Sequence, residues 1–378
     1  MVLDTGRRRL LKGLGAGVGA AVAAPMLNLG SVAVAATGKA YPTRVVDLVK
    51  RSLVIDMLAP LTLVLDAEHF AWRLTPEEVA RFKSSGVTAF HHSAGIGGYD
   101  DVLAFMAGWA GFVGRNSDLF LMVDRVGDIE HAKASGKLAV IMGQQDADHF
   151  RTPADVKLFH QMGQRVSQLT YNAQNLLGSG STERIDGGVS DYGVAIIEEM
   201  NKVGMTVDVS HSGDRTTLDA IELSKKPIAI THSNCRALND HPRLKTDEAI
   251  KALAKKGGVM GISGVRMFLS KQEPTTVETI VDHIDHVVKL TGVEHVGIGS
   301  DSDLLGYDKL PPAMNKALRA NYKASYAFRE KIDTDGYDTP TRLFDLTEAL
   351  VRRGYSDAHI GLILGGNFKR LLTETWAA

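Results

Sequence analysis

The sequence predicts an α/β protein built as one closed barrel of eight alternating strands and helices, a (β/α)₈ or TIM barrel. Short runs rich in β-branched and apolar residues recur along the chain, and each ends in polar or glycine residues, as buried parallel strands do. The segments between them carry apolar residues at the three- and four-residue spacing of amphipathic helices. No linker interrupts the alternation and no glycine-rich phosphate loop follows the first run, which favours a closed barrel over an open doubly wound sheet.

The strands and helices can be assigned in order along the chain. Ser190 is expected to cap the helix that precedes the fifth strand, and Gly257 follows the lysine-rich end of a later helix. The predicted strands are 52–58, 86–92, 138–144, 167–172, 206–211, 228–232, 258–263 and 295–300. The clearest predicted helices are 189–203, 216–225, 247–256 and 276–290, with closing helices at 341–353, 356–364 and 367–376.

The first 35 residues have a pattern that sets them apart from the barrel. An arginine triplet at residues 7–9 precedes a run rich in glycine, alanine and valine, and an Ala-x-Ala pattern ends at residue 35. This is the pattern of a cleavable twin-arginine signal peptide, and glycines and Pro25 in the apolar run disfavour a retained anchor. We therefore expect a periplasmic or otherwise exported protein, with the catalytic barrel domain at 36–378 and no integral membrane segment after cleavage.

Composition and charge favour a small molecule as the partner. The 378-residue chain is 44% hydrophobic and 23% charged, as ordinary globular proteins are. Its 43 basic and 44 acidic side chains nearly balance, so no field attracts nucleic acid or an anionic membrane. Cys235 is the only cysteine, which excludes an intramolecular disulfide and a cysteine-based structural zinc site. Histidines and carboxylates remain as possible metal ligands.

Two histidines and an aspartate stand where three predicted strands end. His211 ends the fifth strand, His232 ends the sixth, and Asp301 follows the eighth. Active sites of such barrels lie at the carboxyl ends of the strands, so these side chains are expected to converge. Imidazoles and carboxylates bind zinc or a similar divalent ion, which makes bound water acidic enough to supply hydroxide near neutrality. A hydrogen-bonded structural role would explain any one of the three alone, but the set favours a site.

Six motifs also occur in a particular order and spacing. They are Leu-Thr-Tyr-Asn at 169–172 with Asn-Leu at 175–176, Gly-Met-Thr-Val-Asp-Val-Ser-His at 204–211, Thr-His-Ser at 231–233, His-Pro-Arg at 241–243, His-Val-Gly-Ile-Gly-Ser-Asp-Ser-Asp at 295–303 and Ile-Leu-Gly-Gly-Asn-Phe at 363–368. Together they resemble the membrane dipeptidase family of the amidohydrolase superfamily. The resemblance implies a barrel of the metal-dependent hydrolase type, dipeptides as the default substrate and, because many members pair, a possible homodimer.

The resemblance also implies roles for individual residues. His211 and His232 correspond to the histidine ligands of the more buried metal, and Asp301 corresponds to an aspartate that binds the second metal and handles the proton. Arg243 corresponds to an arginine that pairs with a substrate carboxylate, a role suited to guanidinium, with a surface salt bridge as the alternative. Tyr171 stands where many relatives carry a substrate-contacting histidine, and would either orient a substrate carbonyl or pack within the rim.

The chain departs from the family pattern at two strand ends. The first strand of the family ends like Asp-Gly-His-x-Asp, whereas this chain has Asp-Met-Leu-Ala-Pro at 56–60, so both ligands there are absent. The bridging glutamate of the third strand aligns with Gln145, whose neutral amide does not offset the repulsion of two dications. We therefore expect one ion, Zn²⁺ or another divalent metal, held by the two histidines and Gln145 or Asp146, with water and Asp301 completing the site.

Other histidines are weaker candidates for ligands. His91 and His92 end the second strand and face opposite sides, so only one can face the barrel interior. His283 and His286 lie on a predicted helix, where a solvated face is expected. His149 follows the altered third strand and offers a replacement ligand.

Three functions are compatible with this pattern. The favoured one is a hydrolase that uses a metal-activated water to cleave an amide bond in a small carboxylate-bearing substrate. The same barrel also supports ester or lactone hydrolysis, or a lyase or isomerase step. A non-catalytic relative that binds a small ligand is the third, although such a role would not require His211, His232 and Asp301 together.

Overall fold

The predicted (β/α)₈ barrel is confirmed. The computed structural model describes residues 31–33, 39–59, 73–94, 97–320 and 322–376. Within these ranges, eight parallel strands pair in sequence order, and pairing of Ile298 with Asp56 joins the last strand to the first. The strands are β3 (Ile55–Asp56), β4 (Ala89–Ala94), β6 (Leu138–Gln144), β7 (Gln164–Gln168), β8 (Thr206–Asp208), β9 (Ala229–Ser233), β10 (Val259–Ile262) and β11 (Val296–Ile298).

Strands outside this cycle were not predicted from the sequence. A short strand, β5 (Phe120–Met122), pairs with the first half of β6, while β7 pairs with the second half. A hairpin of β1 (Ser31–Ala33) and β2 (Ala40–Pro42) precedes the barrel. Apart from β1, the predicted signal segment 1–35 lies outside the described residues, so export through the twin-arginine route stays a prediction.

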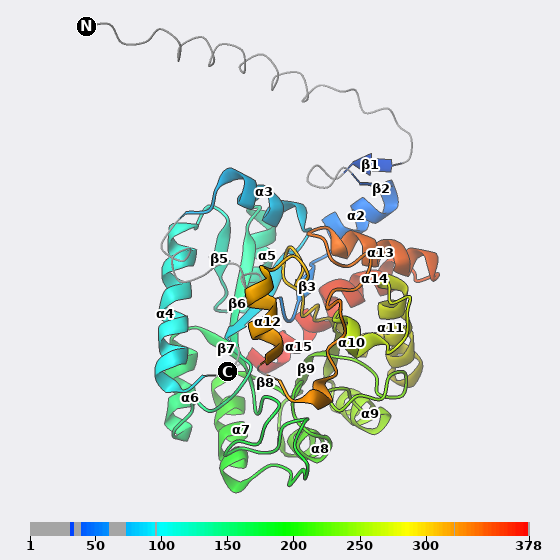
Figure 1. The fold of residues 1–378 in the computed structure, drawn as a ribbon. Coiled ribbons are helices and arrows are strands. Elements are labelled where there is room, and N and C mark those ends of the chain that lie inside the picture. The colour runs from blue at the N-terminus through cyan, green and yellow to red at the C-terminus, as the bar shows by residue number, and fades with distance from the viewer. Residues whose placement is uncertain (1–30, 34–38, 60–72, 95–96, 321, 377–378) are drawn as a thin grey trace, which may run out of the picture.

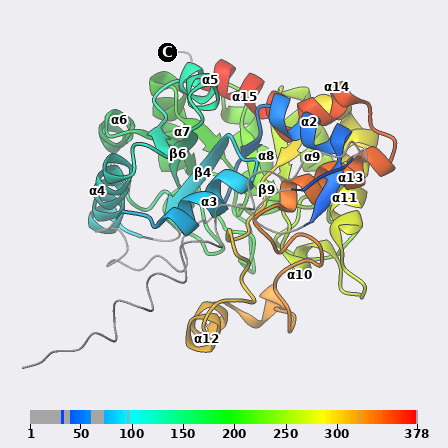
Figure 2. The same ribbon diagram turned by 90° about the horizontal axis from the view of Figure 1, so that it is seen from above.

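Helices surround the strands, as Figures 1 and 2 show. Ser190 caps α7 as predicted, because its side chain accepts a hydrogen bond from the Gly193 N–H. In the described part of the chain, no helix is long and apolar enough to cross a membrane. The helices are α2 (Thr43–Arg51), α3 (Pro76–Ser84), α4 (Tyr99–Arg115), α5 (Val126–Ala134), α6 (Pro153–Gln161), α7 (Asp191–Val203), α8 (Asp214–Leu223), α9 (Asp247–Lys255), α10 (Arg266–Leu269), α11 (Val277–Thr291), η2 (Val293–His295), α12 (Pro312–Ala320), η3 (Ala324–Tyr326), α13 (Arg342–Arg352), α14 (Asp357–Gly361), the π-helical turn η4 (Leu362–Gly366) and α15 (Asn367–Trp376).

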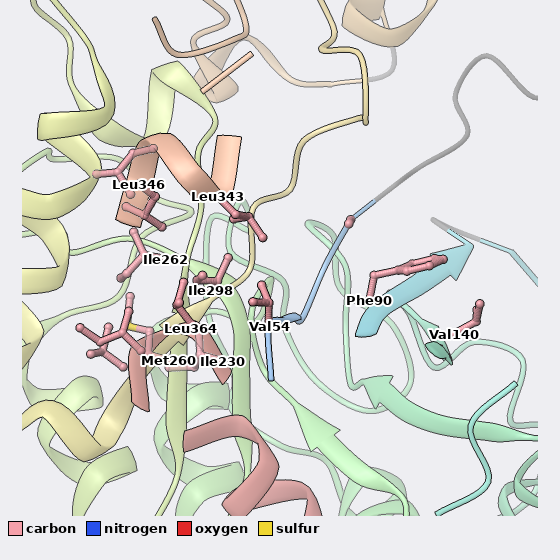
Figure 3. Close-up of a cluster of buried hydrophobic side chains, with 14 of the residues drawn as sticks. Val54, Phe90, Val140, Ile230, Met260, Ile262, Ile298, Leu343, Leu346 and Leu364 are labelled. Carbon is pink, nitrogen blue, oxygen red and sulfur yellow. The ribbon is translucent and has the colours of Figure 1, made fainter. Parts of the chain in front are cut away.

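The core has two parts because the barrel strands bury both faces. Figure 3 shows the outer part, where strand residues such as Ile298 lie near Leu343 of α13 and Leu364 of η4. A second cluster joins strand residues of the opposite face, such as Ile141, to Phe368 of α15. These layers hold the strands in register and thereby fix where the side chains at their carboxyl ends lie.

His283 of α11 is buried, so the predicted solvated position is wrong for this residue. Its Nδ1 accepts a hydrogen bond from the Cys235 N–H at 3.0 Å, and its Nε2–H donates to the Leu269 carbonyl at 3.0 Å. His286 is partly buried, with its Nε2 2.8 Å from Asp247 Oδ1. Burial lowers the pKa of His283 to about 4, so the imidazole is neutral in the folded protein near neutral pH.

Acid is expected to destabilise the fold through this residue. Unfolding restores the ordinary histidine pKa of about 6.5, so the unfolded chain binds a proton that the folded chain excludes. The contribution of His283 is complete above about pH 6.5 and is lost as the pH falls toward 4, by up to about 3 kcal/mol. Urea unfolding of metal-free protein at pH 7 and pH 4.5 should show a pH dependence about 2 kcal/mol smaller in His283→Gln. An equal dependence in both proteins would contradict the assignment.

Candidate metal centre

The predicted site residues lie at the carboxyl ends of β8, β9 and β11. His211 follows β8, His232 lies within β9, and Asp301 follows β11. The two imidazoles are 2% and 0% exposed, whereas Asp301 is partly buried. In the two views, α12 stands in front of the strands and apart from the ring of helices. The segment that contains α12 therefore belongs to the same end of the molecule as the loops that follow the strands.

The structure brings His211 and His232 into direct contact through their Nε2 atoms, which are 3.0 Å apart. The other nitrogen of each ring has a fixed partner. His211 Nδ1 lies 2.8 Å from Asn172 Oδ1, and His232 Nδ1 lies 2.8 Å from Thr231 Oγ1. An amide oxygen is an acceptor only, so the His211 proton is on Nδ1 and a lone pair is on Nε2.

Both imidazoles are held in the neutral form. Burial lowers the pKa of His211 and of His232 well below the ordinary value, and the positive charge of Arg243 lowers both further. The Nε2 lone pair of His211 faces His232 Nε2 at 3.0 Å, and two imidazole nitrogens that face each other in this way can share one cation. The separation suits two ligands of one zinc ion, since Zn–N bonds are about 2.0–2.1 Å. These two residues therefore fit a divalent ion.

Asp301 has two unusual properties. Its φ is 50°, in the left-handed region that non-glycine residues rarely adopt outside turns and functional sites, and its N–H donates to the Leu58 carbonyl at 2.8 Å. Burial raises the pKa of its carboxyl to about 7, against a lowering by Arg243 and with a further rise from Asp56. A carboxyl that titrates near neutrality can both accept and release a proton during a reaction at physiological pH.

Arg243 is 1% exposed and bonds to the backbone beside both histidines. One guanidinium nitrogen donates to the Ser210 carbonyl and, at 3.4 Å, to Ser233 Oγ, and the other donates to the His232 carbonyl at 2.8 Å. Its Nε has no hydrogen-bond partner among the described residues. Arg243 thus ties the ends of β8 and β9 together and places a positive charge at the site, and its predicted pairing with a substrate carboxylate stays a prediction.

Tyr171 covers the outer face of His211. The rings stack with centroids 4.0 Å apart and planes 17° apart, and the Tyr171 hydroxyl lies 2.9 Å from that of Tyr322. A cavity of about 460 Å³ adjoins this cover and is lined by Asp146, Asp148, Tyr171, Asn172, Ala173, Gln174, Thr182, Tyr322, Lys323 and Tyr326. A larger cavity, of about 670 Å³, lies at the amino ends of β4 and β6, away from the histidines. Ligand access to the pair is therefore expected through the smaller one.

The predicted third ligand, Gln145, follows β6 and is 9% exposed. Asp146 has partners within the protein, since its Oδ1 accepts hydrogen bonds from Asn175 and from the Ala147 N–H. His149 is also engaged, with its Nε2 3.0 Å from the Gln164 amide oxygen. Across the described ranges, no three histidine, cysteine, aspartate or glutamate side chains form a ready metal site. The structure thus brings together two of the predicted ligands, and the role of Gln145 stays a prediction.

His91 and His92 face opposite sides of β4, as predicted. His91 points inward: its Nδ1–H donates to the Met57 carbonyl at 2.7 Å, and its Nε2 has no hydrogen-bond partner in the described part. Gly143 makes room for this ring, because a Cβ there would lie 1.9 Å from His91 Nε2. His92 packs outward against Trp109, with ring centroids 4.0 Å apart. Of these two histidines, His91 is therefore the one that adds a polar group to the barrel interior.

A (β/α)₈ barrel with a convergent histidine pair and an aspartate at the carboxyl ends of its strands has the architecture of barrel metal-dependent hydrolases. Comparison with known families agrees with this class. The family model "Membrane dipeptidase (Peptidase family M19)" matches residues 98–321, more than half of the chain. The chain belongs to the membrane dipeptidase family.

Individual relatives support the same assignment. The chain is 29% identical to dipeptidase verJ of Clonostachys rogersoniana over 261 residues, which cover 68% of this chain and 61% of that protein. It is 34% identical to an uncharacterized dipeptidase of Schizosaccharomyces pombe over 196 residues, 50% of this chain and 47% of that one. The matched part thus spans about half to three fifths of these relatives' length.

Solved structures agree on the fold. An amidohydrolase from Pseudomonas aeruginosa has a TM-score of 0.77 and 29% identity, with 88% of this chain and 99% of that one covered. A metallo peptidase from Rhodobacter sphaeroides, bound to a phosphinate mimic of the dipeptide L-Ala-D-Ala, has a TM-score of 0.70, 19% identity and coverage of 85% and 99%. At that identity the second likeness shows the barrel alone.

Proposed function

We propose that the protein is a metal-dependent hydrolase that cleaves an amide bond in a small, carboxylate-bearing, dipeptide-like substrate, with one Zn²⁺ ion. The observation that carries this proposal is the pair of neutral imidazoles whose Nε2 atoms converge at 3.0 Å. Membership of a metallopeptidase family supports a divalent metal at this position. The loss of the charged ligands of the first and third strands supports one ion rather than two.

In this proposal His211 and His232 hold the ion, and Gln145 is the candidate for a third ligand. A bound zinc ion supplies a Lewis acid and makes water a nucleophile near neutral pH. Asp301 takes the proton of the attacking water and returns it to the leaving amine, since its pKa of about 7 suits transfer in both directions. Burial of the pair beneath Tyr171 limits access of bulk water to the reacting groups.

The substrate would be oriented by charge and by the adjoining cavity. The Nε of Arg243 has no hydrogen-bond partner among the described residues, and we propose that it meets the substrate carboxylate. In this proposal Tyr171 orients the substrate carbonyl, which its position in the cavity lining and its stacking on His211 support. The cavity of about 460 Å³ is in the size range of small-molecule sites and suits a substrate as small as a dipeptide.

Removal of the metal is expected to abolish activity. Purified protein should contain about one zinc ion per chain, lose hydrolysis of dipeptides on treatment with a chelator, and recover it when Zn²⁺ is added back. A panel of dipeptides, esters and lactones run in parallel separates amidase chemistry from the alternative esterase or lactonase chemistry. Protein that contains no divalent metal and hydrolyses nothing in the panel would overturn the proposal.

A further inference from the structure

Asp208 is a fully buried carboxylate at the end of β8. It has no role in the proposed reaction described above. Its Oδ1 accepts hydrogen bonds from the Ser210 N–H at 2.9 Å, the Ser210 hydroxyl at 2.5 Å and the Thr231 N–H at 3.0 Å. Its Oδ2 accepts the Thr231 hydroxyl at 2.5 Å. With four donors on two oxygens, this carboxylate acts as an acceptor only.

The direction of the next hydrogen bond follows from the number of protons. The Thr231 hydroxyl has one proton, and that proton is donated to Asp208. The hydroxyl can therefore only accept from its other neighbour, His232 Nδ1, at 2.8 Å. Ser210 cannot change this, because its own proton is also donated to Asp208. Hence His232 carries its proton on Nδ1, and the lone pair is on Nε2.

A separate group has the same effect on His211. The group is the side-chain amide of Asn172. Its oxygen accepts the Ser181 hydroxyl at 3.2 Å and faces His211 Nδ1 at 2.8 Å. Asn172 thus fixes the ring orientation of the second histidine, and both lone pairs point at one place.

We infer that Asp208 is a positioning residue that, through the Thr231 hydroxyl, holds His232 in the tautomer whose Nε2 lone pair faces His211. Asn172 holds His211 in the matching tautomer. The inference rests on the proposed function in one respect, that the histidine pair binds a divalent ion. Groups that orient metal-binding histidines in this way typically change metal affinity by about 10- to 100-fold when they are replaced.

The test is the variant Asp208→Asn, which reverses the chain of donors. An amide NH₂ in place of Oδ2 donates to Thr231, whose hydroxyl then donates to His232 Nδ1 and moves the imidazole proton to Nε2. We expect Zn²⁺ affinity, measured by competition titration, to fall about 10- to 100-fold. In metal-free protein with ¹⁵N-labelled histidine, the ring nitrogen shifts of His232 should change from the Nδ1–H to the Nε2–H tautomer. A purely structural role would leave those shifts unchanged.

Two further variants keep the test decisive if Asp208→Asn does not fold. Thr231→Val removes the hydroxyl and should weaken zinc binding, whereas Thr231→Ser retains it and should restore the wild-type affinity. Thr206→Val is the matched control, because Thr206 is a buried threonine at the opposite end of β8 whose hydroxyl lies 2.8 Å from that of Thr375. This control should leave zinc affinity within about twofold of the wild type, as a site without metal contacts should.

The outcomes separate this inference from the proposed function. If the wild-type protein binds no divalent ion, the proposed function fails, and the ring shifts of the wild-type protein still decide the tautomer. If the wild-type His232 carries its proton on Nε2, the inference is overturned. It is also overturned if Asp208→Asn and Thr231→Val bind zinc as the wild type does.

Discussion

Replacement of His211 by alanine is expected to remove tight binding of the divalent ion and to lower kcat/KM by more than about 100-fold. Loss of a group that only orients a ligand already costs about 10- to 100-fold in affinity or activity, so loss of the ligand itself should cost more. His232 cannot compensate, because its single Nε2 lone pair supplies one bond. Zinc content per chain, a zinc competition titration and kcat/KM for the best substrate of the panel measure the effect.

The matched control for this variant is His295→Ala. His295 is partly buried beside β11, and its Nδ1 lies 2.8 Å from the Gly258 carbonyl. The same chemical change there removes one structural hydrogen bond and should leave zinc content unchanged. Circular dichroism establishes that both variants are folded. If His211→Ala retains its zinc and its rate, the histidine pair is not the metal centre.

Most of the barrel could be predicted from the sequence because its strands follow the rules for buried parallel sheets. The strand 138–144 is apolar along most of its length and has the predicted bounds. The fourth strand was placed too late, at 167–172, because the observed strand at Gln164–Gln168 is mainly polar. Its polar residues are buried with partners far along the chain: Gln164 contacts His149, and Arg165 bonds to Asp124. Polar residues that are buried through such long-range contacts give no alternation of apolar and polar residues in the sequence, so the strand could not be recognised there.

The histidine pair could be located from the sequence for a topological reason. In a parallel barrel all strands end on the same rim, so residues that end the fifth and sixth strands must be neighbours whatever their separation in sequence. The groups that fix their tautomers could not be assigned in this way. Asp208, Thr231 and Asn172 were visible as polar residues within the motifs, but their direction of hydrogen bonding depends on distances between side chains of different strands.

Replacement of Asp301 by asparagine is expected to lower kcat by about 10²- to 10⁴-fold while zinc content is retained, because a general acid and base contributes rate enhancements of this size. The substitution removes the charge and the titratable group while it keeps the size and shape of the side chain. Asparagine tolerates the left-handed backbone at φ 50° about as well as aspartate, whereas alanine would add backbone strain. Zinc content separates a proton-transfer role from a ligand role, since loss of the ion in this variant would show that Asp301 helps to hold it.

The proposed role of Asp301 also predicts how the rate changes with pH. A general base works only in the deprotonated form, and burial raises the pKa of the Asp301 carboxyl to about 7. The value applies to the metal-free site, and the charge of a bound dication lowers it. The wild-type kcat/KM should therefore have an acid limb at or below about pH 7, along which it falls about tenfold per pH unit, whereas the residual activity of Asp301→Asn should lack this limb. Rates measured between pH 5.5 and 8.5 distinguish the two profiles. If the acid limb persists in Asp301→Asn, another group carries the proton, and the inward-facing His91 becomes the next residue to replace.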